Sequence, residues 1–111
     1  MNGVAWDFYL PPPPSVNSTR RVDYAVAAGY AKWQDAAGWE MKAQGYRVGI
    51  PVECAVEVTL LFPRTADLDN RIKAMLDLMT KMRLYRDDRQ VQRLVAEFHD
   101  GDRVAISIRV I

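Results

Sequence analysis

The sequence predicts an α/β fold of the α+β type, with a mixed β-sheet in one layer and helices packed against it in a second layer. Two observations support this prediction. Four segments alternate apolar and polar residues as strands do, and two longer segments repeat apolar residues every three or four positions, as helices do. The predicted order is β-α-β-α-β-β. Because 111 residues is a usual size for one domain, we expect residues 1–111 to form a single domain.

The first half of the chain predicts a strand, a stiff connector and a helix. Residues 4–10, "VAWDFYL", alternate in the manner of a strand. The prolines of "PPPPSVN" then force an extended segment and end strand pairing. Residues 21–44 predict a helix whose core-facing stripe is Val26, Tyr30, Trp33, Ala37 and Met41. Gly45 is placed to terminate this helix.

The second half predicts a strand, a helix and a closing pair of strands. Residues 52–62 alternate most clearly, and Cys54 lies on the apolar side, so we expect it to be a small buried residue. Residues 69–82 predict a helix with the apolar stripe Ile72, Met75, Leu76 and Met79. Residues 91–98 and 103–111 predict strands joined by "HDGDR", whose Asp-Gly pair is typical of a hairpin turn.

The composition restricts the class of protein. The formal net charge is +1, which argues against a simple non-specific nucleic-acid binder. The chain lacks an apolar run of about 20 residues and has no secretory signal pattern, so we expect a cytoplasmic protein without a membrane partner. Between Arg64 and Arg93, eight basic residues interleave with five aspartates. This pattern is typical of a solvated helix with surface ion pairs, or of a site that binds cations beside an anionic substrate.

The string "TADLDN", residues 65–70, places Asp67 and Asp69 where a strand gives way to a helix. One aspartate there can act as a helix cap, and Asp69 can pair with Lys73 one turn later. A helix cap explains one carboxylate, but not two. Two unpaired carboxylates about 4 Å apart repel each other by roughly 4 kcal/mol at an effective dielectric of about 20. A divalent cation would turn this repulsion into attraction. Oxygen-only ligands suit Mg²⁺ or Mn²⁺, and Ile72 stands where a calcium loop needs glycine.

A longer string carries a resemblance to a known family. "ADLDNRIKAMLDLMTKMRLYRDDRQVQRLVAEF" closely resembles the core of the RusA family of Holliday junction resolvases, and "PPPPSVN" is similar to the proline-rich start of that family. The resemblance follows the whole chain in order and is dense from about residue 64 to residue 98. It implies a metal site of Asp67, Asp69 and Asp88, with Lys73 also required for catalysis.

Two further residues, Asp87 and Asn70, match the family pattern in less defined roles. Asp87 is an additional candidate metal ligand, Asn70 is a candidate supporting residue, and Asp77, one turn after Lys73, is a second candidate supporting residue. The chain also departs from the pattern, because Ala66 stands where family members often carry a basic residue. Arg64, two residues earlier, is a candidate substitute, and this question stays open on the sequence alone.

The resemblance implies a homodimeric endodeoxyribonuclease that uses Mg²⁺, with Mn²⁺ as a substitute and no organic cofactor. Such an enzyme resolves four-way DNA junctions by paired symmetric nicks in recombination and repair, and a phage or prophage origin would fit. The alternatives are a nuclease for branched DNA more broadly and a non-catalytic junction-binding protein on the same fold. Candidate phosphate contacts are Arg20, Arg21, Arg64, Arg71, Lys81, Arg83, Arg86 and Arg89.

Overall fold

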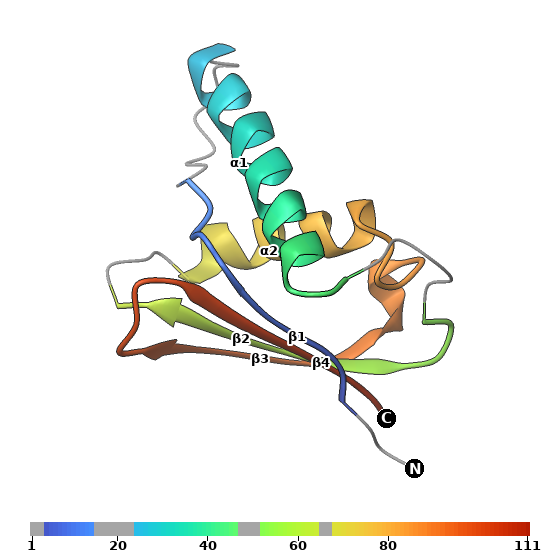
Figure 1. Ribbon diagram of the computed structural model, residues 1–111. Helices are drawn as coiled ribbons and strands as arrows, with labels where there is room; N and C mark the ends of the chain where they lie inside the picture. The colour runs from blue at the N-terminus through green and yellow to red at the C-terminus, as the bar shows by residue number, and fades with distance from the viewer. Residues whose placement is uncertain (1–3, 15–23, 47–51, 65–67) are drawn as a thin grey trace.

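The structure, a computed structural model, describes residues 4–14, 24–46, 52–64 and 68–111 (Figure 1). In chain order these residues form β1 (Val4–Leu10), α1 (Tyr24–Ala43), β2 (Val56–Pro63), α2 (Leu68–Lys81), the 3-10 helix η1 (Asp88–Gln90), β3 (Val91–His99) and β4 (Val104–Val110). The predicted order of strands and helices is therefore confirmed, with η1 added. Neither described helix has the length and apolar character needed to cross a membrane.

The four described strands form one mixed sheet in the order β1-β4-β2-β3. β2 and β3 run parallel, and the β1–β4 and β2–β4 pairs are antiparallel. The predicted hairpin of the last two strands is wrong, because β2 lies between β3 and β4 and pairs with both. Both helices lie on the same side of the sheet, which gives the predicted two layers (Figure 1). Since β2 and β3 are parallel, α2 is the crossover that connects them and carries the chain back from one end of the sheet to the other.

The core lies between the sheet and the two helices. Alternate residues of β2 are fully buried on the helix side, and α1 and α2 cover them with apolar stripes. The buried residues from these three elements include Val58, Leu60, Phe62, Trp33, Ala37, Met41, Met75, Leu78 and Met79. Most of the predicted stripe positions are thus confirmed. Tyr30, Ile72 and Leu76 are only half-buried, because they lie at the flanks of their helices, and the side chain of Val26 is outside the described set.

The prediction for Cys54 is wrong, because this residue is exposed. The strand begins at Val56 rather than at residue 52, and Val52 makes only an isolated bridge to Tyr85. Residues 53–55 therefore leave the sheet although their apolar alternation continues. The helix predicted over 21–44 is observed as Tyr24–Ala43, and residues 21–23 lie outside the described ranges.

Both helices end in the same hydrogen-bonded motif. The amide of Tyr46 donates to the carbonyl of Met41, and the amide of Leu84 donates to the carbonyl of Met79. Such an ending places one residue in the left-handed region, which glycine adopts most easily. The predicted terminator Gly45 has φ 101°, whereas α2 uses Arg83 with φ 61°. A side chain in this region costs roughly 1–2 kcal/mol, so Arg83 adopts it against its local preference.

We predict that Leu60→Ala will lower the free energy of unfolding by about 2–5 kcal/mol, because it opens a cavity in a fully packed site. Leu60 is 0% exposed on the central strand β2. Urea denaturation measures the change. Leu61→Ala is the matched control, since Leu61 faces the side of the sheet without helices, and it should cost less than about 1 kcal/mol. Equal losses in the two variants would contradict the described orientation of β2.

Candidate functional site

One face of α2 carries the predicted polar residues of the helix. Positions 69, 73, 77 and 80 recur every three or four residues and therefore lie along the same side. Lys73 is exposed on this face, whereas Asp77 and Thr80 are half-buried. For Asp69 and Asn70 the structure describes the backbone, in the first turn of α2, and Asp67 lies outside the described residues.

Asp88 is hydrogen-bonded to the last turn of this helix. The Thr80 Oγ1 lies 2.7 Å from Asp88 Oδ1 and 3.1 Å from the carbonyl oxygen of Leu76. The hydroxyl has one proton, which it donates best to the nearer, charged carboxylate. Asp88 itself is exposed in η1. This contact fixes one carboxylate oxygen and leaves the second as an available acceptor among the described contacts.

Asp87 stabilises the turn in which it lies. It is the N-cap of η1, and its Oδ1 accepts a hydrogen bond from the amide of Arg89 at 2.9 Å. The Arg89 guanidinium lies 3.0 Å from Asp87 Oδ2. These hydrogen bonds from the Arg89 side chain and amide lower the pKa of Asp87. Both oxygens of Asp87 are therefore engaged within the turn, and its role as a metal ligand remains a prediction.

Gln90 holds the turn that presents Asp88, and the sequence analysis did not identify it. Its Nε2 donates to the carbonyls of Val52 at 2.7 Å and Cys54 at 3.0 Å. Its Oε1 accepts from the amides of Arg86 at 2.7 Å and Asp87 at 3.0 Å. Four backbone groups from two segments thus meet at one side chain. The spacing Asp-x-x-Gln is that of a capping box and could have identified Gln90.

The two ends of α2 are too far apart for one chain to bring all predicted ligands together. Position 69 and Thr80 are separated by eleven residues, which is about 16 Å along a helix. An aspartate carboxylate oxygen lies within about 4 Å of its own Cα. The Thr80 contact holds Asp88 Oδ1 within about 5 Å of the Thr80 Cα. A gap of about 7 Å therefore remains between a carboxylate oxygen at position 69 and Asp88 Oδ1. Two ligands of one Mg²⁺ are at most about 4 Å apart. The described part of the chain, which leaves out Asp67 and the side chain of Asp69, contains no group of three His, Cys, Asp or Glu side chains that could hold a metal ion.

Two tyrosines lie beside the carboxylates of α2 and η1. Tyr85 is buried, and its hydroxyl lies 3.3 Å from the carbonyl oxygen of Leu76. Burial raises the pKa of Tyr85, and the carboxylates of Asp88 and Asp77 raise it further. Burial and Asp77 also raise the pKa of Tyr30 on α1. Both hydroxyls therefore keep their protons at neutral pH.

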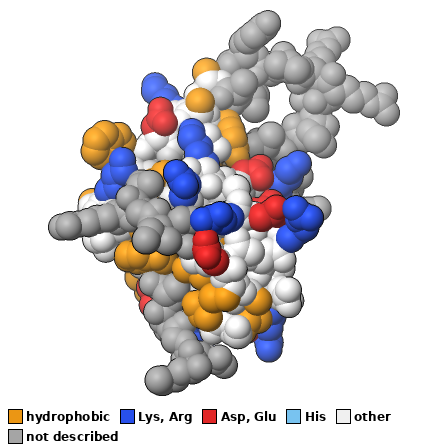
Figure 2. Space-filling model, turned by 90° about the vertical axis from the view of Figure 1, so that its right-hand side faces the viewer, with side chains coloured by type: hydrophobic (Ala, Val, Ile, Leu, Met, Phe, Trp, Pro, Cys, Tyr) orange, Lys and Arg blue, Asp and Glu red, His pale blue; other side chains and the backbone are white. Residues whose placement is uncertain are grey.

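Most of the described candidate phosphate contacts already have partners. Arg64, Arg86 and Arg89 form ion pairs with Asp100, Glu53 and Asp87, and these arginine side chains are more than half exposed. Exposed pairs contribute little to stability, so a DNA phosphate can replace the carboxylate at low cost. Figure 2 views the molecule from the right-hand side of Figure 1, where α2 ends, and basic and acidic side chains intermingle there. Arg20 and Arg21 lie outside the described residues.

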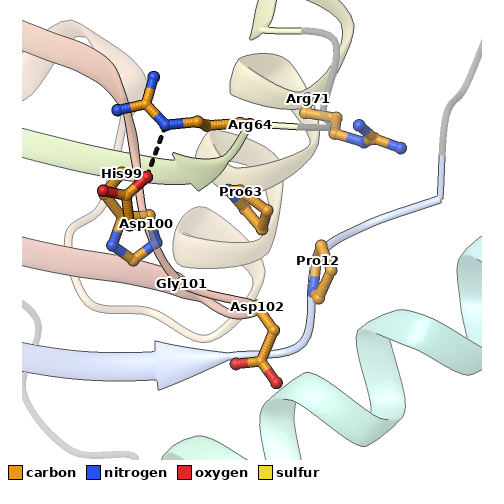
Figure 3. A pocket seen from close by; sticks show the side chains of 8 residues that line it. All are labelled: Pro12, Pro63, Arg64, Arg71, His99, Asp100, Gly101 and Asp102. Carbon is orange, nitrogen blue, oxygen red and sulfur yellow. Dashed lines mark hydrogen bonds and ion pairs between the residues drawn. The ribbon is translucent and has the colours of Figure 1, made fainter.

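A cavity of about 420 Å³ opens at the other end of α2, where β2 ends (Figure 3). Its polar lining comes from Arg64, Arg71, His99, Asp100 and Asp102. The Arg71 Nε donates to the carbonyl of Pro13 at 3.0 Å, and Lys81 Nζ at the far end of α2 is 3.0 Å from Gln34 Oε1. The cavity lies at the end of β2, beside Pro63 and the first turns of α2, and it offers guanidinium groups to an anionic ligand.

Comparisons with known proteins agree with these features. A family model described as "Endodeoxyribonuclease RusA" matches residues 11–111, a range that includes α2, η1 and β3. The chain is also similar to the protein named "Crossover junction endodeoxyribonuclease RusA" of Aquifex aeolicus (strain VF5), with 33% identity over 69 residues. The aligned segment covers 60% of this chain and 52% of that protein, so it spans about half the length of this curated relative.

We predict that Gln90→Ala will lower the free energy of unfolding by about 1–3 kcal/mol, because it leaves several partly buried backbone groups without a partner. The amides of Arg86 and Asp87 should exchange with solvent faster, which hydrogen exchange measured by NMR will detect. Gln92→Ala is the control, since Gln92 is an exposed glutamine on β3. Unchanged exchange at Arg86 and Asp87 in Gln90→Ala would show that another contact holds the turn.

Proposed function

The chain belongs to the RusA family of endodeoxyribonucleases, and we propose that it is a magnesium-dependent homodimeric endonuclease that resolves four-way DNA junctions. The family match supports nucleolytic cleavage of junction DNA. The observation that supports our version of the site is the position of Asp88, which Thr80 holds at the opposite end of α2 from Asp69. We further propose that the enzyme acts in the cytoplasm, on DNA undergoing recombination or repair.

The candidate ligands fit Mg²⁺ by their chemistry, since all of them are carboxylates and hard cations prefer oxygen. We propose that Asp67 and Asp69 of one subunit and Asp88 of the other bind the ion, and that Mn²⁺ can substitute. Bound Mg²⁺ would supply an activated water and stabilise negative charge at the scissile phosphate. Thr80 orients Asp88 through the 2.7 Å hydrogen bond. Lys73, exposed one turn after position 69, would neutralise charge on the phosphate in the transition state.

A two-fold dimer solves the distance problem and gives two equal sites. When two copies of α2 meet in opposite directions, the first turn of each faces the last turn of the other. Each pairing then combines position 69 from one subunit with Asp88 from its partner. Because the two sites are related by a two-fold axis, they suit a four-way junction, which needs two symmetric nicks. The exposed arginines near η1 would contact phosphates outside the cleaved bonds.

We predict that Asp88→Asn will abolish junction cleavage in Mg²⁺ while junction binding persists or tightens, because one repulsive charge near the phosphates is removed. Cleavage of a synthetic four-way junction, with linear duplex and chelator as references, measures the first effect, and gel mobility measures the second. Asp35→Asn is the matched control on the exposed surface of α1, and it should cut at the wild-type rate. Wild-type cleavage by Asp88→Asn would remove Asp88 from the site.

A mixture of two inactive variants tests whether the site is shared. We predict that Asp69→Asn and Asp88→Asn, each inactive alone, will regain cleavage when refolded together. In the mixed dimer, one site receives both substituted residues and the other receives both native aspartates. The expected product is therefore a nick in one strand only, in the fraction of molecules that are mixed dimers. Absence of any recovery, with mixed dimers demonstrated by mass spectrometry, would indicate that each site belongs to a single chain.

A further inference from the structure

The chain has three tryptophans, and Trp39 is the one that lies in solvent. Trp33 is buried, and its indole nitrogen donates to the carbonyl of Pro11 at 2.8 Å. Trp6 is half-buried and packs edge-on against Tyr46. Trp39 lies in the second half of α1 and is 70% exposed. Because a large apolar side chain stabilises a fold through burial, Trp39 contributes little to this fold and its ring is accessible to a ligand.

A lysine lies over the Trp39 ring. Lys42 follows one turn later on the exposed side of α1, and its Nζ is 4.9 Å from the centroid of the ring. The two nearest carboxylates of α1 compete little for this lysine. Glu40 is paired with Arg103 at 2.6 Å, and Asp35 is exposed one turn before Trp39. An aromatic ring beside a cation can stack on a nucleobase and hold the adjoining phosphate.

The end of α2 packs against α1 directly beside Trp39. Gly38 permits this approach, since a Cβ at its position would lie 3.1 Å from the sulfur of Met82. The hydroxyl of Tyr46, just after α1, donates to the carbonyl of Met82 at 2.5 Å. The residues that follow Met82 therefore lie next to the half of α1 that carries Trp39.

Arg83 follows Met82 in an unfavourable backbone conformation. Its φ of 61° is in the left-handed region, which glycine adopts most easily. Its side chain is exposed, so the core does not require an arginine here. The guanidinium lies near Tyr46, because its charge partly offsets the rise in the pKa of Tyr46 that burial causes. A strained residue that packing does not explain is a sign of function.

Three cations meet at this end of the molecule. Lys42, Lys81 and Arg83 are all exposed, and the ion pairs of the described residues include none of them. Lys81 lies 3.0 Å from a neutral partner, the Oε1 of Gln34, and so keeps its net charge. Figure 2 faces this end and shows several basic side chains gathered over it, with apolar side chains at their border. A polyanion would therefore meet uncompensated positive charge beside an exposed indole.

From these observations we propose that Trp39, Lys42 and Arg83 form a platform for a single-stranded segment of branched DNA. One unpaired base stacks on the indole of Trp39, and the phosphates on either side of it contact Lys42 and Arg83. The bases of a duplex cannot make this contact, because they are stacked on one another, whereas a branch point or a single-stranded arm offers free bases. The proposal rests on the proposed nuclease and adds a substrate class to it.

The platform lies at one end of the proposed metal site. Lys81 directly follows Thr80, whose hydroxyl holds Asp88 at 2.7 Å. The same end of α2 thus carries the Asp88 contact and adjoins the platform. A single strand bound on the platform would lead toward Asp88, so the enzyme would hold the unpaired segment beside the duplex that it cuts.

Fluorescence anisotropy with a labelled strand of about 12 thymidines, in the presence of chelator, tests the stacking. Trp39→Ala should raise the Kd about tenfold or more, whereas Trp39→Phe keeps a ring and should stay within about threefold of the wild type. Tyr9→Ala is the matched control, since Tyr9 is a 61% exposed aromatic on β1, and its Kd should not change. Circular dichroism checks each fold; if Trp39→Ala unfolds, Trp39→Gln replaces it with the same expected loss.

A strand of the same length without bases separates stacking from charge. The wild type should bind this abasic strand about tenfold more weakly than the thymidine strand, and Trp39→Ala should bind the two strands equally. Lys42→Gln should weaken both strands alike and reduce the slope of log Kd against log salt by about 0.7. Equal affinity of the wild type for the two strands would overturn the proposal, because the bases would then make no contact.

Substitution of Arg83 tests whether its strained conformation serves binding. Arg83→Gly should raise the urea midpoint of unfolding, because glycine relieves the strain, and should weaken single-strand binding about threefold or more. Arg83→Ala removes the same charge but keeps a Cβ in the left-handed region, so it should weaken binding equally without raising the midpoint. Unchanged affinity in both variants would overturn the role of Arg83 in the platform.

The outcomes separate the platform from the proposed function. Single-strand binding that depends on Trp39, in a protein that cuts no branched DNA with any divalent metal, confirms the platform and removes the proposed activity. Wild-type affinity of Trp39→Ala for the thymidine strand overturns the platform, even if the protein resolves four-way junctions. A wild type without affinity for the single strand also overturns the platform, and symmetric cleavage of a fully paired junction would leave the proposed function in place.

Discussion

The parallel crossover from β2 through α2 to β3 is the constraint on which the rest of the structure depends. Burial of Met75, Leu78 and Met79 against β2 fixes the helix over the sheet. Two parallel strands must start at the same end, so the segment entering α2 and the turn leaving it lie at opposite ends of the helix. Position 69 and Asp88 are therefore held apart by the same packing that stabilises the fold. A rigid fourteen-residue helix leaves little freedom to bring them together.

Hydrogen bonds rather than buried charges shape the candidate site. Thr80 and Gln90 use neutral groups to place Asp88, and the described residues include no buried charged side chain. The ion pairs of Arg64, Arg86 and Arg89 are exposed and exchangeable. Such a surface can accept a polyanion without a large net positive charge, since each phosphate displaces a weak internal partner. This reconciles a net charge of +1 with a DNA substrate.

Sequence patterns predicted the elements well because local periodicity decides them. The alternation of apolar and polar residues identified the buried side of β2. The ease with which glycine adopts a positive φ identified the end of α1 at Gly45. Cys54 shows where this reasoning stops, since alternation continues where the backbone has already left the sheet. Gln90 acts through four backbone groups, and the capping-box spacing indicates only the local ones, not the carbonyls of Val52 and Cys54 more than thirty residues away. The sequence motif identified the acidic residues as a set. The separation of position 69 from Asp88 became clear only from the length of α2 and the hydrogen bond between Thr80 and Asp88.

The proposed dimer and the proposed metal site require each other. Position 69 and Asp88 lie at opposite ends of α2, so the full set of proposed ligands needs two subunits. A two-fold dimer would join the two halves of the site. Activity would then depend on dimer concentration, because a monomer lacks the ligands for the ion. A nuclease built in this way cannot cut DNA until both of its sites exist, which matches an enzyme that must nick two strands of one junction.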